Sequence, residues 1–484
     1  MSLKKVVGDM GVIGIAQLII SAKGIILLPI LTRYLGAEGY GLWVQAMATI
    51  SVLLPLMVLG LPYSMTRIFP SRDSIEEVSK DFYSISFLVV LASLIVSSLL
   101  LLFPHFLADV IFEGNILVVR IVAVILFIYS SNNLMINVFR AFREMKKFSL
   151  FNVGYKLGEI ALAALFVVLG YGLIGALIAL LIVRGSLFLI LVLLLLRRLK
   201  FSFPDLSRTK EYLDFGVPTV PSNLSHWIVS TSDRYLIGIF LSATYVGYYN
   251  PGYSIGHVVP FMIASVYGLV LPPTLSDYYE KGKISELEQI LELSLKYFFI
   301  VSIPFFFGML LLYEPILVLL TGDIVIATEG GIIAIYSAFT GIIYGIGMLL
   351  SQILVLKKRT KIIGMKWTIA AVVNLGANII LIPIFGIVGA AITTVLAYSI
   401  ATALTLYFSL VDEEELKLDF DYLSYGKMIF SSFMMILLIY LIRLEVWENL
   451  FFLMVLGVAI YFSILFLIGG IKREEIKFLK SMVG

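Results

Sequence analysis

The sequence consists mainly of long apolar blocks, each about as long as a membrane is thick. Hydrophobic residues occupy 60% of the 484 positions and charged residues 14%, against roughly 45–50% and 25% in soluble domains. About 20 apolar residues in a helix cross a hydrocarbon core of about 30 Å. We therefore predict an all-α integral membrane protein of fourteen transmembrane helices. The predicted spans are residues 11–33, 40–66, 82–103, 116–139, 149–169, 172–196, 212–240, 246–275, 290–312, 331–355, 361–382, 386–409, 424–442 and 449–469.

The basic residues predict how these spans are oriented. An even number of spans places both termini on the same side of the membrane. With the N-terminus in the cytoplasm, most of the 35 Lys and Arg residues fall on inner loops, including 143–147, 197–200 and 357–361, as the positive-inside rule requires. We therefore expect a multi-pass protein of the cell (plasma) membrane with cytoplasmic termini and no cleavable signal peptide.

Several function classes are excluded or disfavoured by what the sequence lacks. It contains no cysteine, so disulfides and thiolate metal sites are excluded. It has no Gly-x-x-x-x-Gly-Lys-Ser/Thr phosphate loop, and its three histidines lack zinc-ligand spacing. We expect no cofactor, no metal and no enzymatic activity. The topology accounts for the basic loops, so no nucleic-acid partner is expected either.

Short motifs recur along the chain at a nearly constant offset, which indicates an internal repeat. Each copy contains six spans, and an even number gives both copies the same orientation, with a cavity between them. We predict an N-terminal six-helix lobe at 1–200 and a second one at 208–410. Residues 411–484 form a cytoplasmic loop and two further helices. The recurring pairs are Leu35/Leu241, Ala37/Ala243, Gly41/Gly247, Val52/Val258, Pro104/Pro315, Gly172/Gly386, Gly175/Gly389 and Ala176/Ala390.

Prolines fall in corresponding spans of the two copies. Proline breaks the backbone hydrogen-bond ladder and is tolerated where the freed groups face protein or a water-filled cavity. Interrupted helices at matching positions are typical of a transport site, although prolines are also common in membrane helices generally. The prolines concerned are Pro29, Pro55 and Pro62 in the first copy and Pro218, Pro221 and Pro260 in the second.

Ionisable residues inside the spans are candidates for function, because a charge at the bilayer centre costs at least roughly 2.5–3.5 kcal/mol. Cations outnumber acids among them, and a cationic pathway suits phosphate, pyrophosphate or a uronic acid. We predict that Lys23, Lys156, Arg184 and Arg234 contact an anionic head group and that the acids are candidates for ion coupling. The cations are Lys23, Arg120, Lys156, Arg184 and Arg234, and the acids are Glu159 and Asp233.

Structural explanations compete with these roles. Lys156 and Glu159, three residues apart, are also placed to pair on one helix face. Arg234 could reach outward toward the surface, and Arg120 could be an interfacial anchor. Lys23 and Arg184 lie too deep for either explanation, so we expect both to line the pathway.

Five segments carry a resemblance to a known family. They are LTRYLGAEGYG at 31–41, REMKK at 143–147, GYGLIGA at 170–176, DRYLIG at 233–238 and VGYY at 246–249. These resemble elements of polysaccharide and lipid-linked oligosaccharide flippases, which belong to the multidrug/oligosaccharidyl-lipid/polysaccharide exporter superfamily. The resemblance covers essentially the whole chain.

The resemblance implies two six-helix lobes, alternating access, and a polyprenyl-phosphate-linked glycan as cargo. By position, Lys23 would contact the head-group phosphates and Arg67 would act at the entrance, whereas no family motif matches Arg184. Membrane lipids, and a glycan polymerase or glycosyltransferase, are the partners to expect. The alternative is an ion-coupled multidrug or metabolite exporter, but the first span lacks the acid that drug exporters typically carry. An embedded glycan ligase or transferase is disfavoured by the short outer loops.

Overall fold

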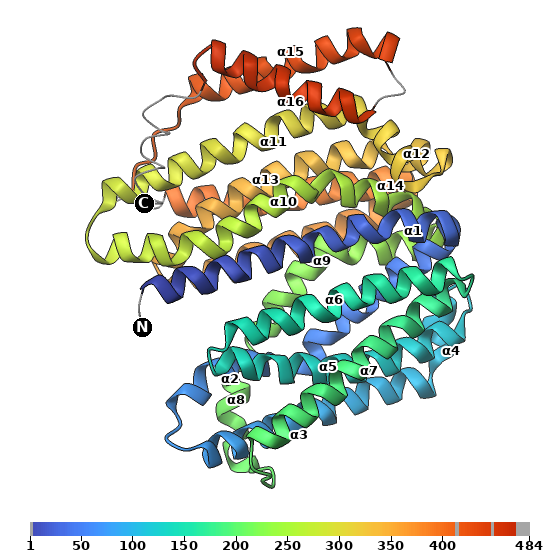
Figure 1. The fold of residues 1–484 in the computed structure, drawn as a ribbon, viewed down its shortest axis with the longest axis vertical. Helices are drawn as coiled ribbons and strands as arrows, with labels where there is room; N and C mark the ends of the chain where they lie inside the picture. The colour runs from blue at the N-terminus through green and yellow to red at the C-terminus, as the bar shows by residue number, and fades with distance from the viewer. Residues whose placement is uncertain (1–2, 412–415, 447–449, 471–484) are drawn as a thin grey trace. The chain divides into compact units, whose positions relative to one another are not determined.

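The computed structural model describes residues 3–411, 416–446 and 450–470, and all regular structure in these ranges is helical (Figure 1). The α-helices are α1 (Leu3–Val58), α2 (Leu61–Ile68), α3 (Ile75–Leu102), α4 (Pro104–Ile111), α5 (Ile116–Ala141), α6 (Met145–Val168), α7 (Gly172–Arg198), α8 (Thr209–Gly216), α9 (Thr219–Phe240), α10 (Ala243–Glu280), α11 (Ile284–Thr321), α12 (Ile324–Gly330), α13 (Ile332–Leu356), α14 (Thr360–Leu406), α15 (Tyr422–Val446) and α16 (Leu450–Leu467). Short 3-10 turns at Phe69–Ser71 and Leu206–Arg208 and a π-helical turn at Tyr407–Val411 join them.

The expected membrane spans all have helical counterparts. Eleven of the described helices are long and apolar enough to cross a membrane. Two of these, α1 and α14, contain a residue with non-helical dihedral angles, Gly36 and Gly386, and each therefore consists of two helices. Helix α9 is 22 residues long and carries Asp233 and Arg234, which makes it more polar than the eleven. With α9 and the two divided helices included, the prediction of a polytopic all-α membrane protein is confirmed.

The chain forms two compact units. The first contains residues 1–250 and 371–390, and the second contains residues 251–370 and 391–484. In the first unit, α1 packs against α5, α6, α7 and α9, and α5 packs against α3 and α7. In the second, α11 packs against α12, α13 and α15, and α15 packs against α16. The lobe boundaries expected from the repeat stay a prediction.

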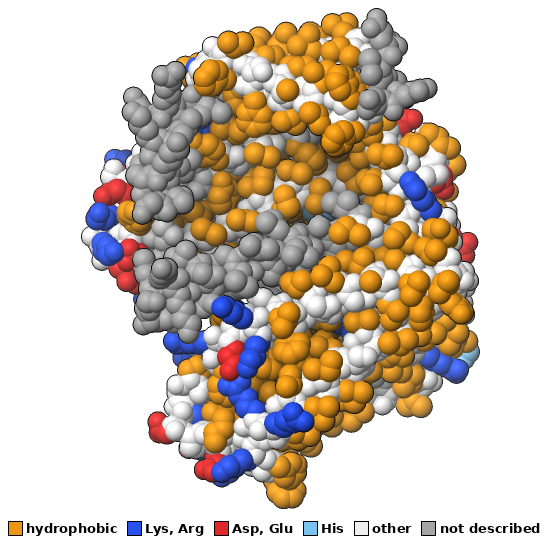
Figure 2. Space-filling view, in the orientation of Figure 1, with side chains coloured by type: hydrophobic (Ala, Val, Ile, Leu, Met, Phe, Trp, Pro, Cys, Tyr) orange, Lys and Arg blue, Asp and Glu red, His pale blue; other side chains and the backbone are white. Residues whose placement is uncertain are grey.

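The outer surface of the helices is apolar along most of their length. On the face drawn in Figure 2, Lys, Arg, Asp and Glu gather toward the helix ends, and hydrophobic side chains cover the stretches between them. Large apolar side chains are exposed at the end of α3 and at the start of α4, namely Leu102, Phe103 and Phe106. Such a surface is stable only in contact with lipid.

Two helices are interrupted where the sequence placed prolines. Helix α1 ends at Val58, Leu59 and Gly60 adopt φ values of 51° and 67°, and α2 begins with Pro62 in its first turn. Similarly, α8 ends at Gly216 before Pro218, and α9 follows. The two breaks lie together, since a Cβ atom on Gly60 would be 2.2 Å from the Gly216 carbonyl oxygen. Pro29, in contrast, lies inside α1 seven residues before the kink at Gly36, and Pro260 lies inside α10.

The internal repeat is visible as a reciprocal backbone contact. A Cβ atom on Gly41 would be 1.8 Å from the carbonyl oxygen of Ala243, and one on Gly247 would be 1.9 Å from that of Ala37. Ala243 and Gly247 are the repeat equivalents of Ala37 and Gly41, so each copy presents the same pair to the other, as in a two-fold interface. Separately, the equivalent residues Gly172 and Gly386 have φ values of 60° and 61°. The predicted parallel repeat is thus confirmed.

We expect Gly41→Ala and Gly247→Ala each to lower stability by about 1–3 kcal/mol, because the new methyl group forces two backbones apart. Thermal unfolding of the detergent-purified protein measures this. Gly185→Ala in α7 is the matched control, since its Cβ would meet no atom within 4 Å; alanine there should be neutral or stabilise by roughly 0.5–1 kcal/mol. Equal melting temperatures for all three variants would contradict the close contact.

Candidate functional site

The first unit contains an open cavity of about 440 Å³. Helices α1, α2, α5, α6, α7 and α9 all contribute to its wall. Pro55, Gly60 and Pro62 at the interruption of α1 and α2 line it directly. One of the two proline-marked breaks is therefore part of the wall of a cavity, which is the setting in which broken membrane helices are tolerated.

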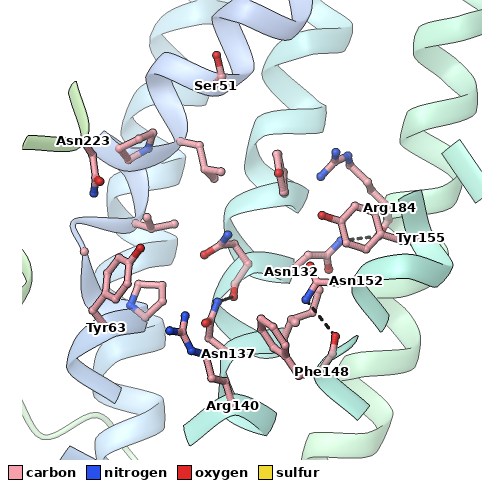
Figure 3. A pocket seen from close by; sticks show the side chains of 18 of the residues that line it. Ser51, Tyr63, Asn132, Asn137, Arg140, Phe148, Asn152, Tyr155, Arg184 and Asn223 are labelled. Atoms are coloured by element: carbon pink, nitrogen blue, oxygen red, sulfur yellow. Dashed lines mark hydrogen bonds between the residues drawn. The ribbon is translucent and has the colours of Figure 1, made fainter. Parts of the chain in front are cut away.

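Amide side chains dominate the polar part of the wall. In Figure 3, Asn132 and Asn137 lie between Arg184 and Arg140, with Asn152 nearby and Asn223 on the opposite side. Rings of tyrosine and tryptophan add flat apolar faces with a polar edge. The polar and aromatic lining residues are Ser51, Tyr63, Tyr129, Asn132, Asn133, Asn137, Arg140, Phe148, Asn152, Tyr155, Arg184, Asn223, His226, Trp227 and Ser230.

The asparagines are held by backbone carbonyls, which fixes their orientation. The Nδ2 of Asn137 donates to the Asn133 carbonyl oxygen at 2.8 Å, and the Nδ2 of Asn152 donates to that of Phe148 at 3.0 Å. A primary amide has two N–H donors and an oxygen with two lone pairs. Each side chain therefore keeps hydrogen-bonding capacity for a guest in the cavity.

Arg184 lies in the cavity wall, but its charge is already compensated. It is 6% exposed, and its Nη2 lies 2.6 Å from Oε1 of Glu159, which is 1% exposed. The Tyr129 ring centroid is 3.5 Å from the guanidinium carbon. Glu159 on α6 thus forms an ion pair with Arg184 on α7. Because a buried guanidinium without a counter-ion would be very costly, this pair allows Arg184 to sit in the wall.

Arg140, at the end of α5, is the other arginine in the wall. It is exposed, and its guanidinium carbon lies 6.0 Å from the ring centroids of both Tyr63 and Phe148. Among the described residues, it forms no ion pair. Arg198 nearby differs, because its Nη1 lies 2.8 Å from Glu144. Burial opposes ionisation of Glu144, but hydrogen bonds from Lys147 and Arg198 outweigh it and lower the pKa of that carboxyl. Arg140 is thus the cation left available to an anion.

The other predicted site residues lie elsewhere. The side chain of Lys23 is outside the described residues, although its backbone belongs to α1. Arg67 is exposed on α2, 4.7 Å from the Phe215 ring centroid. Lys156 is half-buried on α6. Arg67, Lys156 and Arg234 are not among the described residues that line the cavity. Arg120 is exposed near the start of α5.

Asp233 and Arg234 form a buried network around the start of α10. Asp233 is 1% exposed and Arg234 is 6% exposed, and their charged atoms lie 2.6 Å apart. Asp233 also accepts a hydrogen bond of 2.5 Å from the Tyr249 hydroxyl. Arg234 donates to Asn250, whose amide in turn donates to the Tyr40 hydroxyl at 2.7 Å. The network therefore joins α9 and α10 to α1.

The asparagines of the cavity wall were not among the site residues predicted from the sequence, which were all charged. Asn132, Asn133 and Asn137 fall within a predicted apolar span, at a spacing that puts 133 and 137 on one helix face. Polar side chains in a span are expected to face protein or a cavity, so this signal was available. That Asn152 and Asn223 share the same cavity is a tertiary fact that no local pattern indicates. Among the described residues, no group of three His, Asp or Glu could hold a metal ion.

Comparison with known proteins identifies the family to which the chain belongs. A family model described as polysaccharide biosynthesis protein matches residues 6–279. The chain belongs to the polysaccharide biosynthesis protein family. This confirms the resemblance seen in the sequence.

A curated relative and two solved structures illustrate the likeness. Over 284 residues the chain is 24% identical to the probable low-salt glycan biosynthesis flippase Agl15 of Haloferax volcanii, covering 58% of this chain and 59% of that protein, which is less than two thirds of its length. The lipid II flippase MurJ in an inward closed conformation has a TM-score of 0.78 at 17% identity, covering 94% and 98% of the two chains. An inward-facing multidrug resistance MATE family transporter has a TM-score of 0.68 at 18% identity, covering 82% and 94%. At these identities, the two structures establish a shared fold.

We expect Glu159→Gln in this family member to lower stability by about 3–5 kcal/mol, since it leaves the buried Arg184 charge uncompensated. The double variant Glu159→Gln/Arg184→Gln should recover much of that loss. Thermal unfolding of the purified proteins measures the coupling. Lys200→Gln, which breaks an exposed pair with Glu76, should cost only about 0–1 kcal/mol. If the losses of stability caused by Glu159→Gln alone and by Arg184→Gln alone simply added up in the double variant, the ion pair would be contradicted.

Proposed function

We propose that the protein is a flippase that moves polyprenyl-phosphate-linked oligosaccharide or polysaccharide repeat units from the cytoplasmic to the outer leaflet by alternating access. The observation that carries this proposal is the amide-lined cavity inside an otherwise apolar helical unit. Membership of the polysaccharide biosynthesis family and the similarity to a probable glycan flippase support it.

The physical task of a flippase explains why such a wall is needed. A sugar head group carries many hydroxyl and amide groups, and each one placed in hydrocarbon without a hydrogen-bond partner costs several kcal/mol. Asparagine side chains supply both donors and acceptors, and the Trp227 and Tyr63 rings supply faces for the apolar side of a sugar. The lipid tail needs no such help, because it can remain in the bilayer.

The phosphate of the carrier requires a cation. We assign this role to Arg140, because its charge is free of an ion-paired carboxylate among the described residues and a guanidinium binds phosphate oxygens with charge-assisted hydrogen bonds. Lys23, Arg67 and Lys156 remain proposed contacts of the anionic head group along its path. Arg184 and Arg234 would contribute only with their paired carboxylates in place.

Glu159 and Asp233 remain the proposed ion-coupling residues. Each carboxylate is bound to an arginine, so coupling would require it to exchange that partner for a proton or Na⁺ during the cycle. We further propose that the protein lies in the plasma membrane with both termini cytoplasmic, where a glycosyltransferase supplies its cargo and a glycan polymerase can receive it.

Removal of the gene should abolish the corresponding surface glycan and cause its lipid-linked precursor to accumulate in the inner leaflet. Mass spectrometry of extracted lipids, together with surface glycan staining, tests this. Normal surface glycan combined with new sensitivity to cationic drugs would instead identify an exporter.

Arg140→Gln should reduce transport of a fluorescent lipid-linked glycan in reconstituted vesicles about 10- to 100-fold, because a charged hydrogen bond of about 1.5–3 kcal/mol is lost. Arg197→Gln is the matched control: Arg197 is an exposed basic residue in the last turn of α7, outside the cavity wall. Undiminished transport by the Arg140 variant would remove that residue from the proposed pathway.

A further inference from the structure

Two turns of the chain carry a basic residue in a left-handed backbone conformation. Arg143, between α5 and α6, has a φ of 59°, and Lys358, between α13 and α14, has a φ of 56°. The amide N–H of each donates to the carbonyl oxygen three residues earlier, at 2.9 Å and 3.0 Å, and the next amide donates to the carbonyl oxygen five residues before it, at 2.8 Å in both turns. Their offset is close to that of Gly172 and Gly386, so the two turns are equivalent parts of the internal repeat.

Glycine is the usual residue at this position after a helix, because a left-handed conformation brings a side chain close to the backbone. The chain follows that rule elsewhere: Gly170 and Gly282 have φ values of 87° and 69° in turns with the same hydrogen-bond pattern. Both copies of the repeat thus keep a basic residue where glycine would be less strained. The positive-inside rule accounts for basic residues in a loop, but not for one at this position.

We call residues 143–147 and 357–361 the first and second basic turns. Four of their basic side chains are exposed and form no ion pair among the residues that the structure describes. They are Arg143 and Lys146 in the first turn and Lys358 and Lys361 in the second. The two lysines Lys146 and Lys361 are related by the same offset as the left-handed residues. Each turn therefore offers two cations, at the same two positions, to a partner outside the chain.

Acidic residues do not cancel these charges. Residues 357–361 include four basic side chains and no acid. The one acid of the first basic turn, Glu144, is already bound, with its carboxylate oxygens 3.1 Å from Nζ of Lys147 and 2.8 Å from Nη1 of Arg198. Each basic turn is thus a positively charged surface that attracts anions.

An exposed apolar side chain follows each basic turn. Leu150 on α6 is 68% exposed, and Met365 on α14 is 41% exposed. Leu150 comes four residues after Lys146, and Met365 comes four residues after Lys361, so each lysine and its apolar neighbour lie on one helix face. A phospholipid has the matching order, with its phosphate at the membrane surface and its acyl chains directly below. This combination favours a lipid over an acidic protein segment as the partner.

We propose that each basic turn binds the phosphate of an anionic phospholipid, whose acyl chain lies along the apolar side chain on the same helix face. Arg143 and Lys146 hold one headgroup in the first unit, and Lys358 and Lys361 hold another in the second. Ammonium and guanidinium groups form charge-assisted hydrogen bonds with phosphate oxygens, and each cation near an anionic membrane surface strengthens binding about fivefold. The inference concerns the surrounding membrane and does not depend on the cargo.

The test is native mass spectrometry of the purified full-length protein, titrated with phosphatidylglycerol or with phosphatidylcholine. We expect the wild type to bind phosphatidylglycerol at two sites, at least tenfold more tightly than phosphatidylcholine. The double variants Arg143→Gln/Lys146→Gln and Lys358→Gln/Lys361→Gln should each weaken one of the two sites about 25-fold, because two cations are removed.

The matched control is Lys281→Gln/Lys283→Gln, in the turn between α10 and α11. That turn has the same hydrogen-bond pattern, but Gly282 holds its left-handed position, and the lysines lie 2.6 Å from Asp277 and 3.4 Å from Glu286. The same loss of two cations there should leave phosphatidylglycerol binding unchanged. Equal affinity of the wild type for both lipids, or an equal loss of affinity in the control, would overturn the inference.

Two glycine variants separate lipid binding from folding. Arg143→Gly and Lys358→Gly relieve the left-handed conformation, so neither should lower the melting temperature in lipid-free detergent, whereas each should weaken phosphatidylglycerol binding at its site about fivefold. A lower melting temperature with unchanged lipid binding would show that the side chains only support the turn, and the inference would be wrong. Tighter binding of a soluble poly-glutamate peptide than of phosphatidylglycerol would assign the basic turns to a protein partner and overturn it as well.

Discussion

The arrangement of the first unit depends on one constraint: a charged side chain buried among membrane helices needs an oppositely charged side chain next to it. Arg184 and Glu159 meet this requirement by pairing between α7 and α6, and Asp233 and Arg234 meet it within α9. Without these pairs the first unit would contain buried ions with no counter-charge, which costs several kcal/mol for each ion. With them, the same helices can enclose a polar space while facing lipid on their outer sides.

This constraint also decides the character of the cavity. Counting intramembrane cations in the sequence suggested a strongly positive pathway. In the structure, the carboxylates neutralise Arg184 and Arg234, and amides provide most of the remaining polarity. The wall is thus built more for hydrogen bonding than for attracting charge, and Arg140 stands apart as an exposed arginine near the end of α5.

The fold was predictable because its determinants are local. Apolar block length sets the spans, and Gly172 and Gly386 mark equivalent turns through their positive φ. The prolines of the second span predicted an interruption, and Pro55 and Pro62 lie in the cavity wall. The pairing of ions was not predictable. Glu159 on α6 pairs with Arg184 on α7. No local spacing indicates that partner, because the rotation and packing of whole helices decide such contacts. The same holds for Asn152 and Asn223, which only tertiary structure brings to Asn132.

The reciprocal contact of Gly41 with Ala243, and of Gly247 with Ala37, has a consequence for how such a chain can evolve. Gly41 and Gly247 cannot gain a side chain freely, because a Cβ atom at either would lie within 2 Å of a carbonyl oxygen of the other copy. The contact therefore imposes the same restriction on equivalent positions of the two copies, so a mutation in one copy is felt by the backbone of the other.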